Sequence, residues 1–418
     1  MNSTTTTIRI EESLKKEAVA LLNDIGLNLS SAMTLFLKAV VRKRGIPFDL
    51  TEQKKGANPQ DSSNNLKLNQ AFLVKKDEFF TDYSDVEKEL KFYSDAFENM
   101  VVFCNCDDPF ESAFFRYFVL HFEELGIKKL ISTCYATSGF RGSEYPVIGR
   151  QCAYKTEVVR VPDFSLLRHD ESLDLKALFD MPENKLTCLK GDGDFRSEEC
   201  KKLLKEADIV VTNPPFSLFR EYISLLEKYK KKYVILGNMN ASTCKEVFPL
   251  LKTNKVWYGL SIRSGDRKFF VPNDYSLYAT GCGVDERGKK FIRVKGVRWF
   301  TNIVTETKTK PLLLNSVYSP QRYPTYENYD AIEVSKVNDI PKDYDGVMGV
   351  PITFLDKYCP DQFEILMLAN GNARTNTPST VLEKVKYKIH SNDRGGAGIV
   401  DGKRVYARIL IRRKKICT

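Results

Sequence analysis

The sequence lacks an apolar run long enough to span a bilayer, and it contains only three histidines. Its opening residues, MNSTTTTIRI, include no apolar segment of the secretory kind, so we expect a cytoplasmic protein with no membrane partner. The ten cysteines form no CxxC pair. With so few histidines, this argues against a zinc site, and we expect free thiols and no bound metal.

The charged residues of the sequence are unevenly distributed. The chain has 418 residues, 28% of them charged, and a formal net charge of +10. Residues 250–310 carry 13 Lys and Arg against 5 Asp and Glu, and residues 401–418 carry 7 against 1. The rest of the chain is therefore net acidic. Such a concentration of positive charge suits a polyanionic partner, most simply nucleic acid, although a solvated basic face would have the same composition.

The first fifty residues have the pattern of a small strand-helix-helix unit. TTTTIRI alternates as a strand, with Ile8 and Ile10 on one face, and two amphipathic helical patterns follow, which end near Gly26 and Gly45. A unit this small cannot bury all its apolar faces alone. Pairing with a second copy would cover them.

Residues 3–50 resemble ribbon-helix-helix antitoxins of the RelB/DinJ type. The resemblance implies a homodimer through residues 1–50, whose paired strands enter the major groove of DNA, and a toxin as a candidate partner. In that arrangement Thr5, Thr7 and Arg9 would face the bases. The alternative is an arm that only dimerises and has no role in DNA binding.

Residues 51–72 are polar and without period, which is typical of a flexible linker. From residue 73 to about 280, strand patterns alternate with helical patterns, so we predict an α/β domain with a parallel, doubly wound sheet. Residues 281–418 read as a β-rich C-terminal region. Within it, NDRGGAGIV at residues 392–400 lacks the lysine of a phosphate-binding loop, and we expect a mobile loop there.

The stretch DIVVTNPPFSLF places a sharp turn after a short apolar strand. Asn213, Pro214, Pro215 and Phe216 follow IVV directly, and ligands bind at the carboxyl ends of strands in open α/β sheets. Asn-Pro-Pro-Phe in this position is the signature of amino methyltransferases that use S-adenosylmethionine. An amide oxygen and a backbone carbonyl that the prolines hold in place can accept the two N–H groups of a weakly nucleophilic amine, and the aromatic ring can stack on the flipped base.

Further stretches are shared with one family of such enzymes. They are KKDEFFTDYSDVEKEL (75–90), VVFCNCDDPFESAFFRYF (101–118), GDGDFRSEE (191–199) and YDGVMGVPITFLDKYCPDQFEIL (344–366). Together with the Asn-Pro-Pro-Phe stretch, they resemble the EcoRI-type adenine-specific DNA methyltransferases over most of residues 73–418. The resemblance implies a Rossmann-like methyltransferase sheet in residues 73–280 and a DNA target-recognition region in residues 281–418.

The same resemblance implies particular residue roles. Asn213, Pro214, Pro215 and Phe216 are the catalytic tetrapeptide. The implied S-adenosylmethionine-binding residues are Phe80, Thr81, Asp107, Asp108, Asp192 and Asp194. The segment CNCDDPFESAFF departs from the glycine-rich first loop of many methyltransferases, although it agrees with the EcoRI type.

The function that these features predict is a site-specific DNA methyltransferase. It would transfer a methyl group from S-adenosylmethionine to the N6 amine of a flipped adenine in double-stranded DNA, with a cognate restriction enzyme as a further candidate partner. One alternative is an RNA or protein methyltransferase on the same core. Another is an antitoxin-like DNA-binding regulator that carries an inactive methyltransferase domain.

Overall fold

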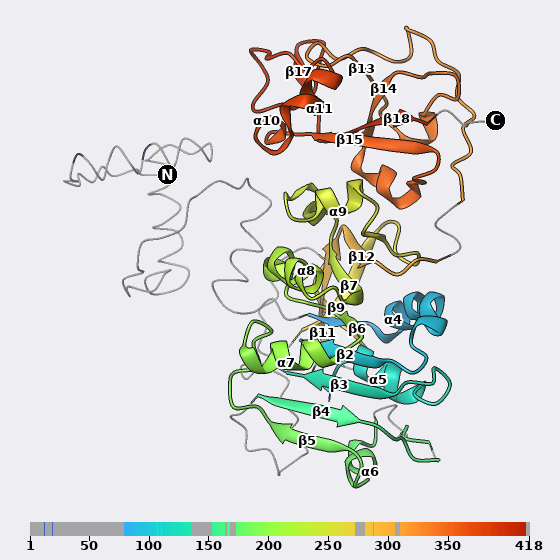
Figure 1. Ribbon diagram of the computed structural model, residues 1–418, viewed down its shortest axis with the longest axis vertical. Coiled ribbons are helices and arrows are strands. Elements are labelled where there is room, and N and C mark those ends of the chain that lie inside the picture. Colours follow the sequence, from blue (N-terminus) through green and yellow to red (C-terminus); the bar gives the residue numbers. More distant parts are fainter. Residues whose placement is uncertain are drawn as a thin grey trace, which may run out of the picture. The chain divides into compact units, whose positions relative to one another are not determined.

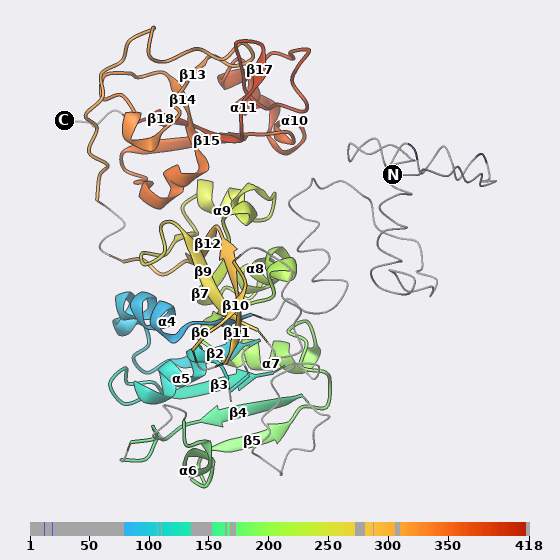
Figure 2. The same ribbon diagram turned by 180° about the vertical axis from the view of Figure 1, so that it is seen from behind.

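The computed structural model describes residues 79–106, 108–109, 111–134, 153–163, 165–167, 173–271, 281–286, 288–305 and 310–414, together with Glu12 and Val19. The chain divides into two units, Met1–Val74 and Lys75–Thr418. Figures 1 and 2 show the helices and strands of the second unit from opposite sides. In the first unit, Glu12 and Val19 have helical backbone. The expected N-terminal strand, with Thr5, Thr7 and Arg9, and the expected linker at 51–72 lie outside the described residues.

An eight-stranded sheet forms the centre of the second unit, in the order β5-β4-β3-β2-β6-β7-β12-β8. The strands are β2 (Val101–Asn105), β3 (Lys129–Thr133), β4 (Tyr154–Val158), β5 (Lys185–Cys188), β6 (Ile209–Thr212), β7 (Lys232–Asn238), β8 (Trp257–Tyr258) and β12 (Val297–Thr301). The four middle strands, β3, β2, β6 and β7, pair in parallel. Their carboxyl ends therefore meet along one edge, as the sequence predicted for the turn after β6.

The expectation of a wholly parallel sheet is wrong towards both margins. β4 runs antiparallel to β3 and β5, and β12 runs antiparallel to β7 and β8. Burial explains the change at β4, where inward and partly exposed residues alternate, because antiparallel strands tolerate one solvated face.

Cys188 of β5, at the margin of the sheet, is disulfide-bonded, so the expectation of free thiols is wrong at this position.

Helices cover both faces of the central sheet. They are α4 (Tyr83–Leu90), α5 (Ala113–Leu120), α6 (Leu175–Phe179), α7 (Glu198–Glu206), α8 (Phe219–Lys228) and α9 (Phe248–Lys252). Successive residues of β2 point to opposite faces: Val102 packs in the core with α4 and α5, and Phe103 packs in the core with α7 and α8. β2 is therefore buried on both faces, which explains its continuous apolar sequence.

Local capping explains where α5 begins. The Ser112 side chain accepts hydrogen bonds from the backbone N–H groups of Phe114 and Phe115, at 3.1 and 3.2 Å.

Shorter 3-10 turns lie at η1 (Lys91–Ala96), η2 (Phe216–Leu218), η3 (Met239–Thr243), η5 (Val337–Asp339) and η6 (Ile352–Lys357). Among the described residues, no helix is long and apolar enough to cross a membrane.

A second sheet brings distant parts of the sequence beside the central one. Its antiparallel order is β1 (Phe80–Thr81), β9 (Asp266–Phe270), β11 (Lys290–Lys295) and β10 (Gly283–Val284). Phe80 pairs with Phe270, and Thr81 pairs with Phe269. This pairing fixes the beginning of the second unit against the hairpin that follows β8.

The C-terminal region contains a third sheet and a small hairpin. The sheet consists of β13 (Ala331–Glu333), β14 (Val347–Pro351), β18 (Arg408–Arg413) and β15 (Phe363–Ala369), and the hairpin consists of β16 (Ile399–Val400) and β17 (Lys403–Arg404). Two short helices accompany them, α10 (Ala373–Asn376) and α11 (Ser379–Lys384).

Buried contacts join this region to the central sheet. Arg298 of β12 and Asp356 form an ion pair with an Nε–Oδ1 distance of 2.8 Å, and their side chains are 4% and 8% exposed. Lys252 donates from Nζ to the Leu366 carbonyl at 2.6 Å. Residues of both parts, such as Phe300 and Ile409, share one hydrophobic core.

Candidate active site

The carboxyl ends of β2, β3 and β6 are tied together around Asn105. The Thr133 hydroxyl donates to Asn105 Oδ1 at 2.9 Å, and the Thr212 hydroxyl donates to the Asn105 carbonyl. Asn105 is 1% exposed, and its amide nitrogen has no hydrogen-bond partner in the described part of the chain. The sequence reasoning missed this residue. The available signal was a polar side chain that ends an otherwise apolar strand.

The Asn-Pro-Pro-Phe turn follows β6 directly and leads through η2 into α8. Asn213 donates from Nδ2 to the backbone carbonyl of Phe79 at 2.7 Å. A carbonyl can only accept, so this contact settles which end of the Asn213 amide is which. Asn213 Oδ1 then faces the other way, buried and without a partner among the described residues.

Three phenylalanine rings surround the turn. Phe79, Phe216 and Phe269 form a triangle in which every pair of ring centroids is 6.0 Å apart. Phe216 meets both neighbours edge to face and remains partly exposed, whereas Phe269 is buried. Edge-to-face packing leaves the ring of Phe216 oriented by its neighbours, which suits a face that must receive a base.

The predicted cofactor residues Phe80 and Thr81 lie in β1, at the beginning of the same segment. Thr81 is 8% exposed, and its hydroxyl has no partner among the described residues. The strand alternation places Phe80 on the face opposite Thr81, opposite Phe270 in the register. Of these two residues, Thr81 is therefore the one whose side chain has a hydroxyl without a hydrogen-bond partner among the described residues.

Asp108 lies just beyond β2, and its carboxylate accepts a hydrogen bond from a residue of a neighbouring strand. The Tyr154 hydroxyl, from β4, donates to Asp108 Oδ1 at 2.6 Å, and both residues are 3% exposed. Burial, together with the negative charge of Asp108, holds the pKa of the Tyr154 phenol well above its ordinary value. The pair thus anchors the loop after β2 to β4. Asp107 lies outside the described residues.

The GDGDF loop returns to the end of β3 because of Gly193. Its φ is +82°, and a Cβ at this position would lie 2.2 Å from the Cys134 carbonyl oxygen, so only glycine fits. Asp192 Oδ1 accepts from the Asp194 backbone N–H at 3.0 Å. Both Asp194 oxygens accept from the Arg196 guanidinium, at 2.9 and 2.6 Å, which lowers the pKa of Asp194.

These contacts distinguish the two acidic residues of the loop. The Asp194 carboxylate is occupied by Arg196 and shapes the loop, whereas Asp192 is exposed. A ligand at the carboxyl end of β3 would meet Asp192 more readily than Asp194.

The buried polar atoms near this edge fit a methyltransferase cofactor and its acceptor. Thr81 Oγ1, Asn105 Nδ2 and Asn213 Oδ1 have no partner in the described part of the chain. Leaving such a group unsatisfied costs about 1–3 kcal/mol, so a ligand or a water that completes each of them would be stabilising. One donor, one acceptor and one hydroxyl match the mixed donors and acceptors of S-adenosylmethionine and of an amine substrate.

The outer face of β9 and β11 combines cations with aromatic rings. Lys268 Nζ lies 4.6 Å from the ring centroids of both Phe270 and Phe291, and the Arg293 guanidinium lies 5.8 Å from Phe291. We call this surface the cation–aromatic face: Phe270, Phe291, Lys268 and Arg293. Rings and cations alternating on one surface are typical of contacts with nucleic-acid bases and backbone.

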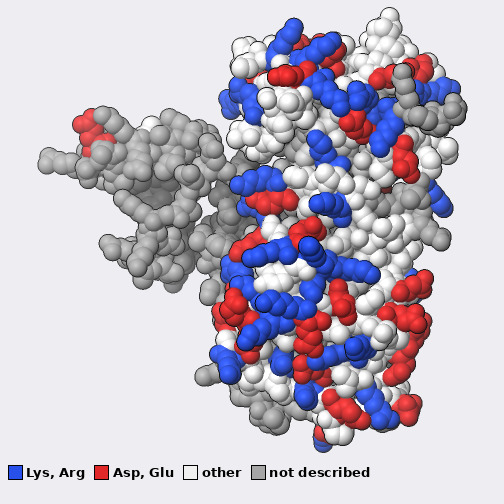
Figure 3. All heavy atoms as spheres, viewed as in Figure 1, with Lys and Arg blue, Asp and Glu red and all other residues white. Residues whose placement is uncertain are grey.

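The basic segments do not produce a uniformly positive surface. Figure 3 shows Lys and Arg side chains over the visible face, interspersed with Asp and Glu. Several cations of residues 250–310 are paired, as in Arg267 with Asp85 and Lys289 with Glu111, both at 3.8 Å. Net charge alone therefore overstates the free positive surface.

A mixed α/β sheet with this turn at its carboxyl edge has the organisation of a methyltransferase. Residues 67–414 match the family model described as adenine-specific methyltransferase EcoRI, so the chain belongs to the EcoRI family of adenine-specific methyltransferases. Residues 3–75 match the model of the RelB antitoxin. No solved structure matches this chain.

Curated relatives span nearly the same length. The chain is 42% identical over 359 residues to the type II methyltransferase M.EcoRI of Escherichia coli, covering 85% of this chain and 98% of the relative. It is 37% identical over 354 residues to the type II methyltransferase M.MgeORF184P of Mycoplasma genitalium, covering 84% and 99%. It is 35% identical over 353 residues to the type II methyltransferase M.MpnI of Mycoplasma pneumoniae, covering 83% and 98%.

The matches confirm both resemblances inferred from the sequence, to the EcoRI-type enzymes and to RelB. They also confirm the predicted enzyme class, a site-specific and adenine-specific DNA methyltransferase.

Proposed function

We propose that this chain transfers a methyl group from S-adenosylmethionine to the N6 amine of an adenine that has swung out of duplex DNA. The observation that carries the proposal is the Asn213 side chain, whose nitrogen is anchored on the Phe79 carbonyl and whose oxygen is buried without a described partner. An N–H of the adenine amine would satisfy that oxygen. The base must leave the helix stack to reach it.

The turn supplies what a weakly nucleophilic amine needs. The lone pair of the adenine amine is delocalised into the ring. Asn213 Oδ1 and the Pro214 carbonyl would each accept one N–H, which holds the nitrogen closer to tetrahedral and directs its lone pair. Pro214 and Pro215 restrict the backbone that carries this carbonyl. The cofactor supplies a methyl group on an already cationic sulfur, so a strong general base is unnecessary, and the extra proton of the product leaves to water.

The cofactor would lie at the carboxyl ends of β2 and β3, in a Rossmann-like, doubly wound arrangement. Thr81 and Asn105 are the best-supported contacts with the cofactor, because each has a buried polar atom without a hydrogen-bond partner among the described residues. Asp192 is exposed and would meet the cofactor's adenine amine. Phe80, Asp107, Asp108 and Asp194 remain proposals from the family resemblance, with Asp108 and Asp194 acting through the loops that they hold.

Duplex DNA is the proposed partner of the second unit. Residues 73–280 would form the catalytic domain, and residues 281–418 would contribute target recognition. The cation–aromatic face supports this assignment, because its rings and cations suit the bases and backbone of a nucleic acid. Phe269 of the same strand, β9, points to the opposite face of the sheet, where it contacts the ring of Phe216.

The first unit would add a second DNA contact. Residues 1–50 would form a ribbon-helix-helix homodimer with Thr5, Thr7 and Arg9 towards the bases, joined by a linker at 51–72. The match of residues 3–75 to RelB supports this proposal and makes a toxin a candidate partner, beside a cognate restriction enzyme. Since the substrate is DNA, we expect the protein to act in the cytoplasm.

Modified-base sequencing tests the proposed function. The wild-type protein and the Asn213→Ala variant are expressed in a bacterial host without adenine methylation, and genomic DNA is sequenced with modified-base detection. We expect N6-methyladenine at one recurring sequence with the wild type and none with the variant. Tritium from labelled cofactor in RNA or protein, with unmodified DNA, would favour the first alternative. No incorporation into any fraction would favour an inactive regulator.

A further inference from the structure

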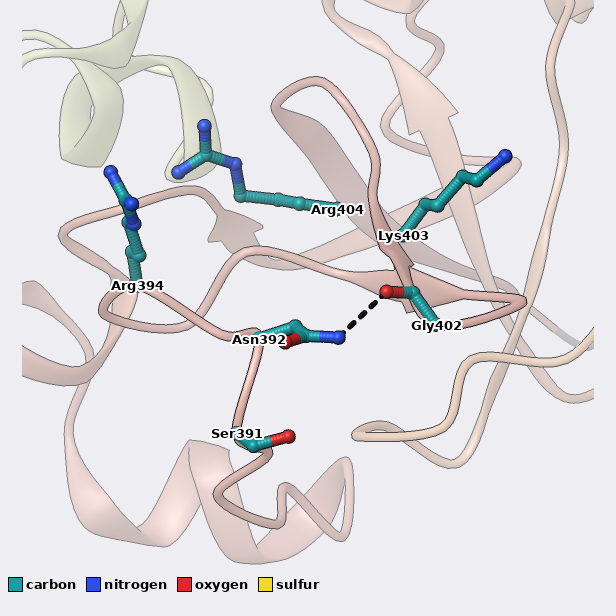
Figure 4. Close-up of a pocket in the computed structure, with 6 residues that line it drawn as sticks. All are labelled: Ser391, Asn392, Arg394, Gly402, Lys403 and Arg404. Atoms are coloured by element: carbon teal, nitrogen blue, oxygen red, sulfur yellow. Dashed lines mark hydrogen bonds between the residues drawn. The ribbon is translucent and has the colours of Figure 1, made fainter.

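An open pocket of about 460 Å³ lies in the C-terminal region, far along the sequence from the catalytic turn. The β16–β17 hairpin forms one wall, and the loop that precedes it forms the other. Among the described residues, the pocket is lined by Ser391, Asn392, Arg394, Gly402, Lys403 and Arg404 (Figure 4). This lining contains three cations and no acid, so the pocket is suited to an anion.

The three cations of the pocket lack partners that neighbouring cations have. Arg394, Lys403 and Arg404 are exposed, and none is ion-paired within the described part of the chain. Other cations of the same region are paired with carboxylates: Lys384, Lys386, Arg408, Arg412 and Arg413. Figure 4 shows the side chains of Arg394 and Arg404 extending to the same side of the pocket, while Lys403 points the other way.

The loop wall makes specific contacts, and Ile399–Val400 of the segment expected to be a mobile loop form β16. Gly395 and Gly396 have φ values of +94° and +111°, and a Cβ at Gly395 would lie 1.8 Å from the Gly371 carbonyl oxygen. The buried Asp393 accepts from the Gly396 N–H and from the Tyr387 hydroxyl. These contacts fix the backbone next to Arg394.

The hairpin wall is fixed to the loop wall and to the rest of the region. Asn392 donates from Nδ2 to the Gly402 carbonyl at 2.8 Å, as Figure 4 shows. The Gly402 N–H donates to Glu327 Oε1 at 2.6 Å, and Glu327 also meets His390 at 3.0 Å. The pocket is therefore formed before any ligand arrives, which reduces the entropy cost of binding.

We propose that this pocket binds a backbone phosphate of duplex DNA, a proposal that rests on the proposed function. Phosphate oxygens only accept hydrogen bonds, and Arg394 and Arg404 present planar donor groups that match them. The hydroxyl of Ser391 lies in the same lining as a neutral donor. The pocket is open at the surface, so a continuous strand can enter and leave it. Such a contact positions the duplex and carries no sequence information.

A salt titration of DNA binding tests the pocket with the full-length chain. Fluorescein-labelled duplexes of two unrelated sequences are titrated by anisotropy with the wild type, Arg394→Ala, Arg404→Ala and the double variant. Lys342→Ala is the matched control, because Lys342 is an exposed cation of the same region outside the pocket, with no ion pair among the described residues. Thermal denaturation confirms that each variant remains folded.

The expected result follows from the release of counterions by one phosphate contact. The double variant should bind both duplexes about tenfold less tightly at about 0.1 M salt, and its log–log salt slope should fall by about 1. Because Arg394 and Arg404 share one phosphate, the two single effects should sum to more than the effect of the double variant. Lys342→Ala should leave affinity, slope and turnover unchanged.

Two outcomes would overturn the proposal. One is an unchanged affinity and salt slope in the double variant, or a loss that appears on only one of the two sequences. The other is calorimetric binding of inorganic phosphate by the wild type that the double variant loses while its DNA affinity is unchanged, which would indicate a small-anion site. Failure of the proposed function is distinct: in that case the wild type itself neither binds nor methylates duplex DNA.

Discussion

Asn213 and Phe79 meet through one hydrogen bond, from the side-chain amide nitrogen of the first to the backbone carbonyl of the second, at 2.7 Å. This contact joins the turn after β6 to the residue that precedes β1. It gives the Asn213 side chain a fixed orientation before any substrate arrives. The oxygen left buried on the other side is the acceptor on which the proposed mechanism depends.

The first prediction removes that acceptor. Asn213→Ala should lower kcat by about 10²–10³-fold, the usual cost of losing one preorganised group that acts on the transition state. Cofactor affinity should change by less than about tenfold, or 1.4 kcal/mol, because Asn213 acts on the nucleophile. Tritium transfer and calorimetry on the same samples measure the two effects, with Asn376→Ala as an exposed control. Near-normal turnover would reject the role of Asn213.

A second prediction separates two members of the aromatic triangle. Phe216→Ala should weaken capture of the extruded base by about 1–3 kcal/mol, the worth of one base–aromatic stack, with little loss of stability. A fluorescent adenine analogue at the target position should brighten on binding to the wild type and less so on binding to the variant. Equal brightening would mean that another ring holds the base.

Phe269→Ala provides the contrast within the same triangle. Phe269 is 1% exposed, so its truncation should mainly lower the free energy of unfolding, by about 3–5 kcal/mol. Chemical denaturation of both variants measures this difference. Comparable destabilisation by the two truncations would argue that Phe216 is a core residue and not a stacking platform.

The strand and turn around Asn213 were predictable because their signals are local. An apolar run followed by two prolines marks a strand end without knowledge of the rest of the chain. The partner of Asn213 was not predictable, because Phe79 reaches the turn only when β1 pairs with β9. Pairing between segments so distant in sequence leaves no local trace.

The same reasoning explains three other features that the sequence did not reveal. The antiparallel placement of β4 was not predicted, because its sequence, YKTEV, is short and the placement depends on both neighbouring strands. Asn105 was missed because its importance comes from Thr133 and Thr212, which other strands supply. Asp194 appeared equivalent to Asp192 in GDGDF, and only the contact with Arg196 distinguishes them.

A third prediction concerns the pH dependence of that contact. Hydrogen bonds from the Arg196 guanidinium hold the pKa of Asp194 below its ordinary value. A carboxylate with a depressed folded-state pKa stabilises the protein fully above the ordinary Asp pKa of about 3.9, and this stabilisation is lost as pH falls through the depressed value. Because both side chains are partly exposed, the contribution should be at most about 1 kcal/mol.

Arg196→Ala tests this dependence by urea unfolding at several pH values. The midpoint difference from the wild type should be largest near neutral pH and should shrink as Asp194 and Glu221, the two carboxylates that Arg196 meets, become protonated. Lys201→Ala removes an ion pair with Glu198 on the neighbouring helix, and it provides a comparison in which the carboxylate is much more exposed than that of Asp194. A difference that stays constant with pH would mean that Arg196 stabilises the loop through packing.

The last prediction concerns residues 1–50, whose match to the RelB antitoxin makes an intertwined dimer the expected state. The full-length chain should be a dimer, and deletion of residues 1–60 should give a monomer that still methylates short duplexes. The shortened protein should bind DNA less tightly and with a shallower salt dependence, because fewer phosphates are contacted. Light scattering and a salt titration of both proteins measure these changes. A full-length chain that is monomeric at micromolar concentration would exclude a ribbon-helix-helix dimer, whereas a dimer that persists after the deletion would place the interface in the second unit.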